Sequence, residues 1–262
     1  LSGTATRRQV ASLEDALPHG RIVAYFQPIV DLRTTGIVAI EALARWQTAD
    51  GVLTPDSFLG KFDSSDLMCQ LFDRMLDSGL HFVAEYRHRL PDLSVAVNFE
   101  FAAVPDDGLA DLVSRRLTEN GVPADQVTIE LNDRIAYSLT PEALATLRSV
   151  ADLGVQLVLD DIATTFESME RLPGVPIAGA KLDRHHVKQI ATGVHEQEVV
   201  RAMLERAADA GIEVIAEGVE TQAQCDRLVA LGCNFGQGYL FAVPQPASSL
   251  AAMLDAPLMN SW

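Results

Sequence analysis

Seven times along the 262-residue chain, a short apolar run of strand length ends at a carboxylate, an amide or a lysine. Helix-like stretches separate most of these runs, which predicts strands paired in parallel through crossover connections. In a closed (β/α) barrel such strand ends converge on one rim, where catalytic side chains gather. The polar residues at the run ends are Glu41, Asn98, Glu130, the pair Asp160 and Asp161, Lys181 followed by Asp183, Glu217, and Gln237.

Periodicity predicts eight strands and six helices. The first two strands are joined only by the segment DLRTT, a length suited to an antiparallel hairpin, so one strand should run backwards. The fold class expected is therefore α/β, a TIM-like (β/α)8 barrel with one antiparallel strand. The strands are expected near 23–30, 37–44, 93–98, 126–131, 155–160, 178–182, 212–217 and 233–236. The helices are expected near 66–89, 107–120, 141–153, 195–210, 221–231 and 246–254.

One domain is expected, because closed α/β barrels routinely occupy about 250 residues as a single unit. We predict a lead-in helix in residues 1–20, the barrel over residues 21–255 and a tail at 256–262. The N-terminal segment has no apolar core of the kind that a signal peptide needs, and no run of eighteen apolar residues suggests a membrane span. Three widely spaced cysteines do not make a disulfide framework. The cytoplasm is the location that fits, for a free protein or for part of a larger one.

The formal net charge of −16 argues against a nucleic-acid-binding surface, because phosphate backbones require clustered Lys and Arg. An anionic substrate would need divalent cations gathered by the rim carboxylates, which invert the local potential. The alternative is that the acidity only aids solubility.

The residues that end the strand runs are mostly oxygen donors, the ligand type that Mg²⁺ or Mn²⁺ prefers, whereas zinc prefers His or Cys. A single carboxylate at a strand end is usually a solvated loop residue, but five oxygen ligands on four converging strands are hard to explain in that way. The five candidate ligands are Glu41, Asn98, Glu130, Asp160 and Asp161.

The adjacent pair Asp160 and Asp161 poses a geometric problem, because neighbouring residues in an extended strand point to opposite faces. Both reach a metal only where the strand is distorted or ends. There they could bridge two cations about 3.5 to 4 Å apart, an arrangement that activates a water for attack on a phosphoryl group. The alternative for Asp161 is an N-cap of the next helix.

Three further strand ends carry candidate chemical groups. Lys181 and Asp183 are expected on the same side of their strand, as a charged pair facing the barrel mouth. Glu217 is a candidate general base or a further metal ligand. Gly218 would relieve crowding at the following turn, where Glu220 and Thr221 would start the next helix. Gln237 lies between two glycines, which suggests close backbone approach to a ligand.

In this order, these residues resemble the EAL family of cyclic di-GMP phosphodiesterases. The combination spans residues 22–250 and is far more specific than any single piece. The matching stretches are YFQPIVDL at 25–32, EALARW at 41–46, VN at 97–98, IEL at 129–131, LDD at 159–161, KLDR at 181–184, AEGVETQAQ at 216–224 and GCNFGQGYLFAVPQP at 232–246.

The resemblance implies hydrolysis of one phosphodiester bond of cyclic di-GMP to linear 5′-pGpG, with two Mg²⁺ or Mn²⁺ ions in the site. It implies metal binding by Glu41, Asn98, Glu130, Asp160 and Asp161. It implies that Lys181 and Glu217 position and deprotonate a water, and that Asp133 and Glu220 lie in a supporting loop or shell. The substrate contacts implied are Gln27, Leu43, Arg45, Asp183 and Gln237.

The departures from the family pattern concentrate in the loop after Asp161. That loop usually reads D-F-G-T-G-Y-S-S, but here Ala163 and Thr165 replace both glycines, whose backbone angles a β-branched residue resists. The family's loop is thought to couple the site to a dimer interface. We therefore expect a homodimer through the barrel rim and this loop, with a sensor or GGDEF-type domain outside the chain. A slow enzyme, or a cyclic di-GMP receptor without turnover, is the alternative.

Overall fold

We describe a computed structural model of the chain over residues 16–59, 65–99, 108–132, 139–162 and 172–255. For Ser65, Asp161 and Ile162 only the backbone is described. Most of the expected lead-in helix and the expected tail lie outside these residues, and so do Asp133 and the substituted loop glycines.

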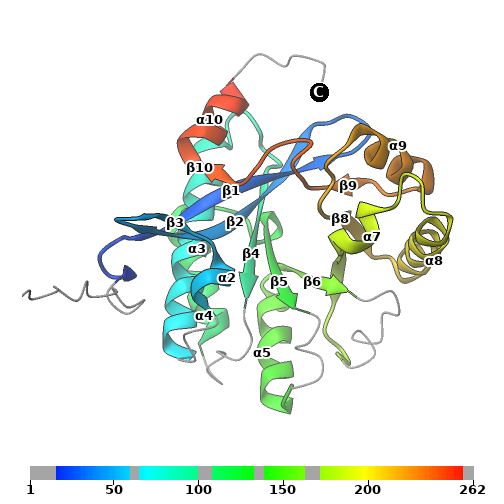
Figure 1. The fold of residues 1–262 in the computed structure, drawn as a ribbon. Coiled ribbons are helices and arrows are strands. Elements are labelled where there is room, and N and C mark those ends of the chain that lie inside the picture. The colour runs from blue at the N-terminus through cyan, green and yellow to red at the C-terminus, as the bar shows by residue number, and fades with distance from the viewer. Residues whose placement is uncertain (1–15, 60–64, 100–107, 133–138, 163–171, 256–262) are drawn as a thin grey trace, which may run out of the picture.

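Eight strands close into a barrel, in agreement with the fold expected from the sequence (Figure 1). The first strand, β1, pairs antiparallel with both of its neighbours in the ring, whereas all other pairs in the ring are parallel. The predicted reversal of one strand is therefore confirmed. In ring order the strands are β1 (Ile22–Asp31), β9 (Phe235–Gly236), β8 (Glu213–Ala216), β7 (Ile177–Leu182), β6 (Gln156–Ile162), β5 (Val127–Asn132), β4 (Ser94–Phe99) and β2 (Ile37–Thr48).

Two short strands extend the sheet outside the ring. They are β3 (Gly51–Leu53), which pairs with β2, and β10 (Gln245–Pro246), which pairs with β1. Neither was expected, because two or three residues carry too little periodicity to be recognised.

Six helices match the expected ones, and three short helical segments were not expected. Figure 1 shows α3, α4 and α5 on one side of the barrel, with α8 and α9 on the other. Among the described residues, no helix is long and apolar enough to span a bilayer. The expected helices are α3 (Ser65–Tyr86), α4 (Leu109–Asn120), α5 (Pro141–Asp152), α8 (Val194–Ala210), α9 (Gln222–Leu231) and α10 (Ala247–Asp255). The unexpected ones are α2 (Pro55–Phe58), η3 (Ala124–Gln126) and α7 (Arg184–Lys188).

The hydrophobic core lies between the outward face of the strands and the helices. On β4, alternation directs Val95, Val97 and Phe99 into this core, and Asn98 lies on the opposite, inward face. The helix α3 approaches β4 so closely at Gly79 that an added Cβ would lie 2.6 Å from a methyl group of Val95. This close contact fixes the position of β4 relative to α3, and hence the position of the inward side chains on β4.

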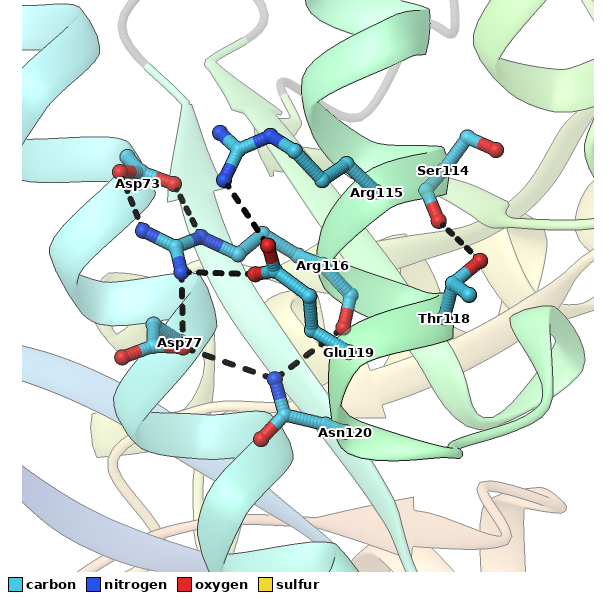
Figure 2. A network of polar contacts seen from close by, with 8 residues as sticks. All are labelled: Asp73, Asp77, Ser114, Arg115, Arg116, Thr118, Glu119 and Asn120. Atoms are coloured by element: carbon cyan, nitrogen blue, oxygen red, sulfur yellow. Dashed lines mark hydrogen bonds and ion pairs between the residues drawn. The ribbon is translucent and has the colours of Figure 1, made fainter.

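Outside the barrel, an arginine joins two of these helices. Figure 2 shows Arg116 of α4 beside Asp73 and Asp77 of α3. Its guanidinium donates to both oxygens of Asp73, at 2.6 and 2.7 Å, and to Asp77 at 3.2 Å. A further bond of 3.0 Å goes to Glu119. The hydrogen bonds to Asp73 raise the pKa of Arg116 above its ordinary value.

The apolar run that stops at Glu41 is only the first part of its strand, which was expected over 37–44. The strand β2 continues to Thr48, so Glu41 lies in its interior, opposite Gln27 of β1. The parallel pairing of β2 with β4 covers only residues 39 to 42, and beyond them β2 pairs with β1 and β3 alone. Glu41 therefore lies where β2 leaves the parallel part of the ring.

Candidate active site

The ammonium group of Lys181 is the centre of a buried ion cluster inside the barrel. Its Nζ atom lies 2.7 Å from Glu217, 3.0 Å from Glu130, 3.3 Å from Glu41 and 3.8 Å from Asp160. Glu130, Glu41 and Asp160 come from β5, β2 and β6, Glu217 directly follows β8, and Lys181 comes from β7. The convergence expected of polar residues on parallel strands is thus present, and only 1% of the Lys181 side chain is exposed.

Small residues on β7 make room for this lysine. An added Cβ on Gly179 would lie 3.1 Å from Val158 and 3.2 Å from the carbonyl oxygen of Glu213, so β7 packs tightly between its neighbours. Alternation along the strand then directs Lys181, two residues later, to the same inward face. The barrel interior is therefore narrow near Gly179, and it is polar around the ammonium group of Lys181.

Side-chain amides hold Glu41 in place. Asn98 donates to one of its oxygens at 2.6 Å, and Gln237 donates to the other at 2.6 Å. The same Gln237 nitrogen donates to the side-chain oxygen of Gln27 at 2.8 Å, and the side-chain nitrogen of Gln27 donates to the carbonyl oxygen of Ala242 at 2.9 Å. Gln27 and Gln237, expected as substrate contacts, therefore lie buried beside Glu41 and orient it.

The cluster carries more negative than positive charge. Burial raises the pKa of Glu130 well above its ordinary range, and the charge of Glu41 adds to this effect. Burial also raises the pKa of Glu217 to about 7, although Lys181 opposes the shift. For Glu41 the ammonium and the amide donors outweigh burial, so its pKa lies below the ordinary value. One ammonium group therefore does not compensate four carboxylates.

The adjacent Asp160 and Asp161 lie at an irregularity of β6. Leu159 pairs with Ala180 of β7, and the next paired residue, Ile162, lies opposite Leu182. Three steps along β6 thus match two along β7, which is the signature of a β-bulge. A bulge breaks strict alternation, so the backbone supplies the distortion that two adjacent ligands would need. The Asp161 side chain is outside the described part of the structure.

One expectation about a loop residue needs correction. Asp183 does not form the expected charged pair with Lys181, because its side chain accepts a hydrogen bond from the backbone N–H of His185 as the N-cap of α7. The glycines that flank Gln237 serve close packing within the protein. An added Cβ on Gly238 would lie 2.1 Å from the carbonyl oxygen of Val219, and one on Gly236 would lie 2.6 Å from Leu32.

The turn that follows Glu217 agrees with the sequence expectation. Gly218 has a φ of +66°, and an added Cβ would lie 2.6 Å from the Cβ of Arg184. Thr221 is the N-cap of α9 and forms a capping box with Gln224. Glu220 precedes this cap, with its side chain exposed and its backbone N–H donating to Gln224. The supporting role expected of Glu220 stays a prediction.

A cavity of about 520 Å³ opens above the ion cluster. Leu43 and Arg45, expected as substrate contacts, line it, and the Arg45 guanidinium lies 5.6 Å from the ring centre of Tyr25.

Asn132 and Asp56 also line the cavity and were not singled out in the sequence. A signal for Asn132 existed, because it follows Glu130 by two residues on the same strand face. One wall is an apolar stripe of α3, formed by Met68, Leu71, Phe72 and Met75.

The donor set fits a hard divalent cation. Among the described residues, no three His, Cys, Asp or Glu side chains are arranged to hold a metal as they stand, since Lys181 lies between the carboxylates. However, one oxygen of Glu130 is buried without a hydrogen-bond partner in the described part of the chain. An uncompensated group of carboxylates with such an oxygen has the chemistry that Mg²⁺ or Mn²⁺ requires.

Comparison with known proteins gives the family. The EAL domain model matches residues 10–244. The chain is 34% identical over 242 residues to the cyclic di-GMP phosphodiesterase RocR of Pseudomonas aeruginosa, a match that covers 90% of this chain and 61% of RocR. An uncharacterized protein of Mycobacterium bovis, Mb1392c, is 31% identical, with 90% and 79% covered. The chain thus spans less than two thirds of the length of RocR.

Solved structures agree in fold. The PaMucR phosphodiesterase, in a complex with c-di-GMP, superposes with a TM-score of 0.83 at 28% identity, over 91% of this chain and 97% of that one. The EAL enzyme Bd1971 in its cAMP-bound form gives 0.83 at 25% identity, over 93% and 68%. Together with the barrel and the motifs at its rim, these matches show that the chain belongs to the EAL domain family, as its sequence motifs predicted.

Proposed function

We propose that this chain hydrolyses cyclic di-GMP to linear 5′-pGpG in a reaction that depends on Mg²⁺ or Mn²⁺. The observation that carries the proposal is the buried cluster of four carboxylates around Lys181, open to a cavity of about 520 Å³. Membership of the EAL family and the likeness to RocR support the same substrate.

Glu217 is the residue that we assign as general base. Only 23% of its side chain is exposed, and burial raises its pKa to about 7, near the value at which a carboxylate accepts a proton from water most effectively at neutral pH. In this proposal Glu217 takes a proton from the attacking water, the new bond forms between that water oxygen and phosphorus, and the bond from phosphorus to the 3′ oxygen breaks. The 3′ oxygen leaves and becomes a hydroxyl by taking a proton from solvent, and Glu217 returns its own proton to solvent, so the net reaction consumes one water.

Lys181 and the amide side chains position the acidic groups. The ammonium group contacts Glu217 at 2.7 Å and Glu130 at 3.0 Å, so it fixes the base relative to the proposed ligands. Gln237 and Asn98 orient Glu41 through its two oxygens. Arg45 at the cavity wall is suited to a phosphate, because a guanidinium offers paired N–H donors.

The proposed metal ligands are the five oxygen donors expected from the sequence, namely Glu41, Asn98, Glu130, Asp160 and Asp161. When bound, a pair of divalent ions would polarise the phosphoryl group and lower the pKa of the attacking water. The β-bulge at Asp160 and Asp161 supports two adjacent ligands on one face. We also propose a cytoplasmic location, a homodimer through the barrel rim, and further domains outside this chain. The greater length of RocR supports the further domains.

The alternative is a receptor that binds cyclic di-GMP without turnover, and it is favoured by the substituted glycines after Asp161. Product chromatography with Mg²⁺, Mn²⁺, Ca²⁺ or a chelator, combined with calorimetry of cyclic di-GMP binding, separates the two. Formation of pGpG with Mg²⁺ or Mn²⁺, absent with the chelator, supports the enzyme. Tight binding without pGpG supports the receptor, and the absence of both contradicts either function.

A further inference from the structure

The loop that carries Glu217 is held by a side chain from the next helix. Gln224, on the first turn of α9, is 6% exposed. Its side-chain oxygen accepts hydrogen bonds from the backbone N–H groups of Glu220 at 2.8 Å and Thr221 at 2.9 Å. These two bonds immobilise the segment that begins three residues earlier with the proposed base.

The nitrogen of the same amide reaches a different loop. The Nε2 atom of Gln224 donates to the carbonyl oxygen of Lys188 at 3.4 Å. Lys188 is the last residue of α7, the short helix that begins directly after β7 and Lys181. One amide group therefore joins the segment that follows β7, the strand of Lys181, to the segment that follows β8 and begins with Glu217.

Other contacts show that these two segments pack directly against each other. The backbone N–H of Glu217 donates to the carbonyl oxygen of Leu182 at 3.0 Å. Gly218 and Arg184 touch so closely that no Cβ fits between them. The distance of 2.7 Å between Lys181 Nζ and the Glu217 carboxylate thus depends on the contacts between the segment after β7 and the segment after β8.

We propose that Gln224 is a positioning residue for the proposed reaction, because its amide fastens the loop after β8 to the end of α7 and thereby sets the position of Glu217 against Lys181. The inference rests on the proposed function of Glu217. A helix cap alone requires only the oxygen of this side chain, since Glu is as suitable as Gln at the third position of a capping box. The nitrogen and its bond to Lys188 are what the positioning role adds.

Gln224→Glu separates the two roles. The carboxylate still accepts from Glu220 and Thr221, but it cannot donate to the carbonyl oxygen of Lys188 and repels it instead. We expect kcat to fall roughly 10- to 100-fold, as for other supporting residues, while KM and the unfolding midpoint stay near wild type. Gln222→Glu is the matched control, because Gln222 is exposed on the same turn and its side chain donates a hydrogen bond to Asp226 on its own helix, away from α7.

Hydrogen exchange gives a second readout that does not depend on turnover. In the metal-free Gln224→Glu protein the N–H of Glu217 should exchange faster than in wild type, whereas those of Glu220 and Thr221 stay protected. Wild-type kcat together with wild-type exchange at Glu217 would overturn the inference. So would a fall in kcat that merely follows a lowered unfolding midpoint.

Two further outcomes remain decisive. If Gln224→Glu does not fold, Gln224→Met removes the same tether without adding charge, and wild-type kcat and Glu217 exchange in that variant would overturn the inference. If wild type forms no pGpG, the proposed function has failed, and exchange at Glu217 then decides alone whether Gln224 fastens the loop.

Discussion

Two clusters in this molecule are built from one cation and several carboxylates, and they differ in their access to water. On the outside, Arg116 joins α3 and α4 through Asp73, Asp77 and Glu119 (Figure 2). Inside the barrel, Lys181 meets four carboxylates. The Arg116 side chain is 21% exposed and its partners are 26 to 47% exposed, whereas Lys181 is 1% and Glu130 0% exposed.

This difference in exposure gives the two clusters different consequences. Around Arg116 water screens the surplus carboxylates, so the cluster acts as a fastener between helices. Around Lys181 the carboxylates are largely buried, and this burial, to which the neighbouring carboxylates add, raises the pKa of Glu130 and Glu217. One cation with several carboxylates thus forms a structural contact at the surface, whereas in the interior it forms a site whose carboxyl groups have shifted pKa values.

The largest effect that separates the two clusters is expected for Glu217→Gln. The amide keeps the size of the side chain but cannot accept a proton, so turnover of cyclic di-GMP should fall about 10²- to 10⁴-fold while binding is retained. Product chromatography and calorimetry measure the two quantities. Wild-type turnover in this variant would remove Glu217 from the role of base.

Lys181→Met is expected to affect both stability and turnover. Removal of the ammonium leaves buried carboxylates uncompensated, which should lower the free energy of unfolding of the metal-free protein by about 3–5 kcal/mol. Urea unfolding measures this loss, and saturating Mn²⁺ should restore part of it. An unchanged free energy of unfolding would show that the buried charge is already balanced without Lys181.

Arg116→Met is the matched change at the surface cluster. Because these carboxylates regain water when the guanidinium is lost, the free energy of unfolding should fall by only about 1–2 kcal/mol. The kcat for cyclic di-GMP should not change. A loss as large as that in Lys181→Met would contradict the distinction between the two clusters.

The smallest expected effect is a release of protons when a metal binds. A carboxylate with a raised pKa carries a proton below that pKa, and a bound cation expels it. Because the pKa of Glu217 is about 7, more protons should be released at pH 6 than at pH 8.5. Calorimetric titration with Mn²⁺ in buffers of different ionisation enthalpy counts them, and heats that do not depend on the buffer at pH 6 would contradict a raised pKa.

Much of the fold followed from periodicity in the sequence. The eight strands of the ring and the reversal of one strand at the first hairpin were predicted, because strand length, helical spacing and a short hairpin are local properties. The convergence of Glu41, Glu130, Asp160 and Lys181 followed from the geometry of parallel strands. The short elements β3, β10 and α2 were missed because they are too short to show a period.

The details of the site depended on contacts distant in sequence, which periodicity does not report. Asp183 became the cap of α7, and the glycines beside Gln237 allow close packing against Val219 and Leu32. Gln237 reaches Glu41, which is 196 residues away, so its role as an orienting amide was visible only once the barrel had closed. Spacing alone could not distinguish such packing from ligand binding.

The most direct test of the central claim is the fate of the water oxygen. We predict that wild type, incubated with cyclic di-GMP and Mg²⁺ or Mn²⁺ in H₂¹⁸O, forms pGpG with one ¹⁸O atom in its 5′-phosphate, and that Glu217→Gln forms little or none. The absence of labelled pGpG from wild type at every concentration of either metal, while cyclic di-GMP still binds, would contradict the account and establish a receptor instead.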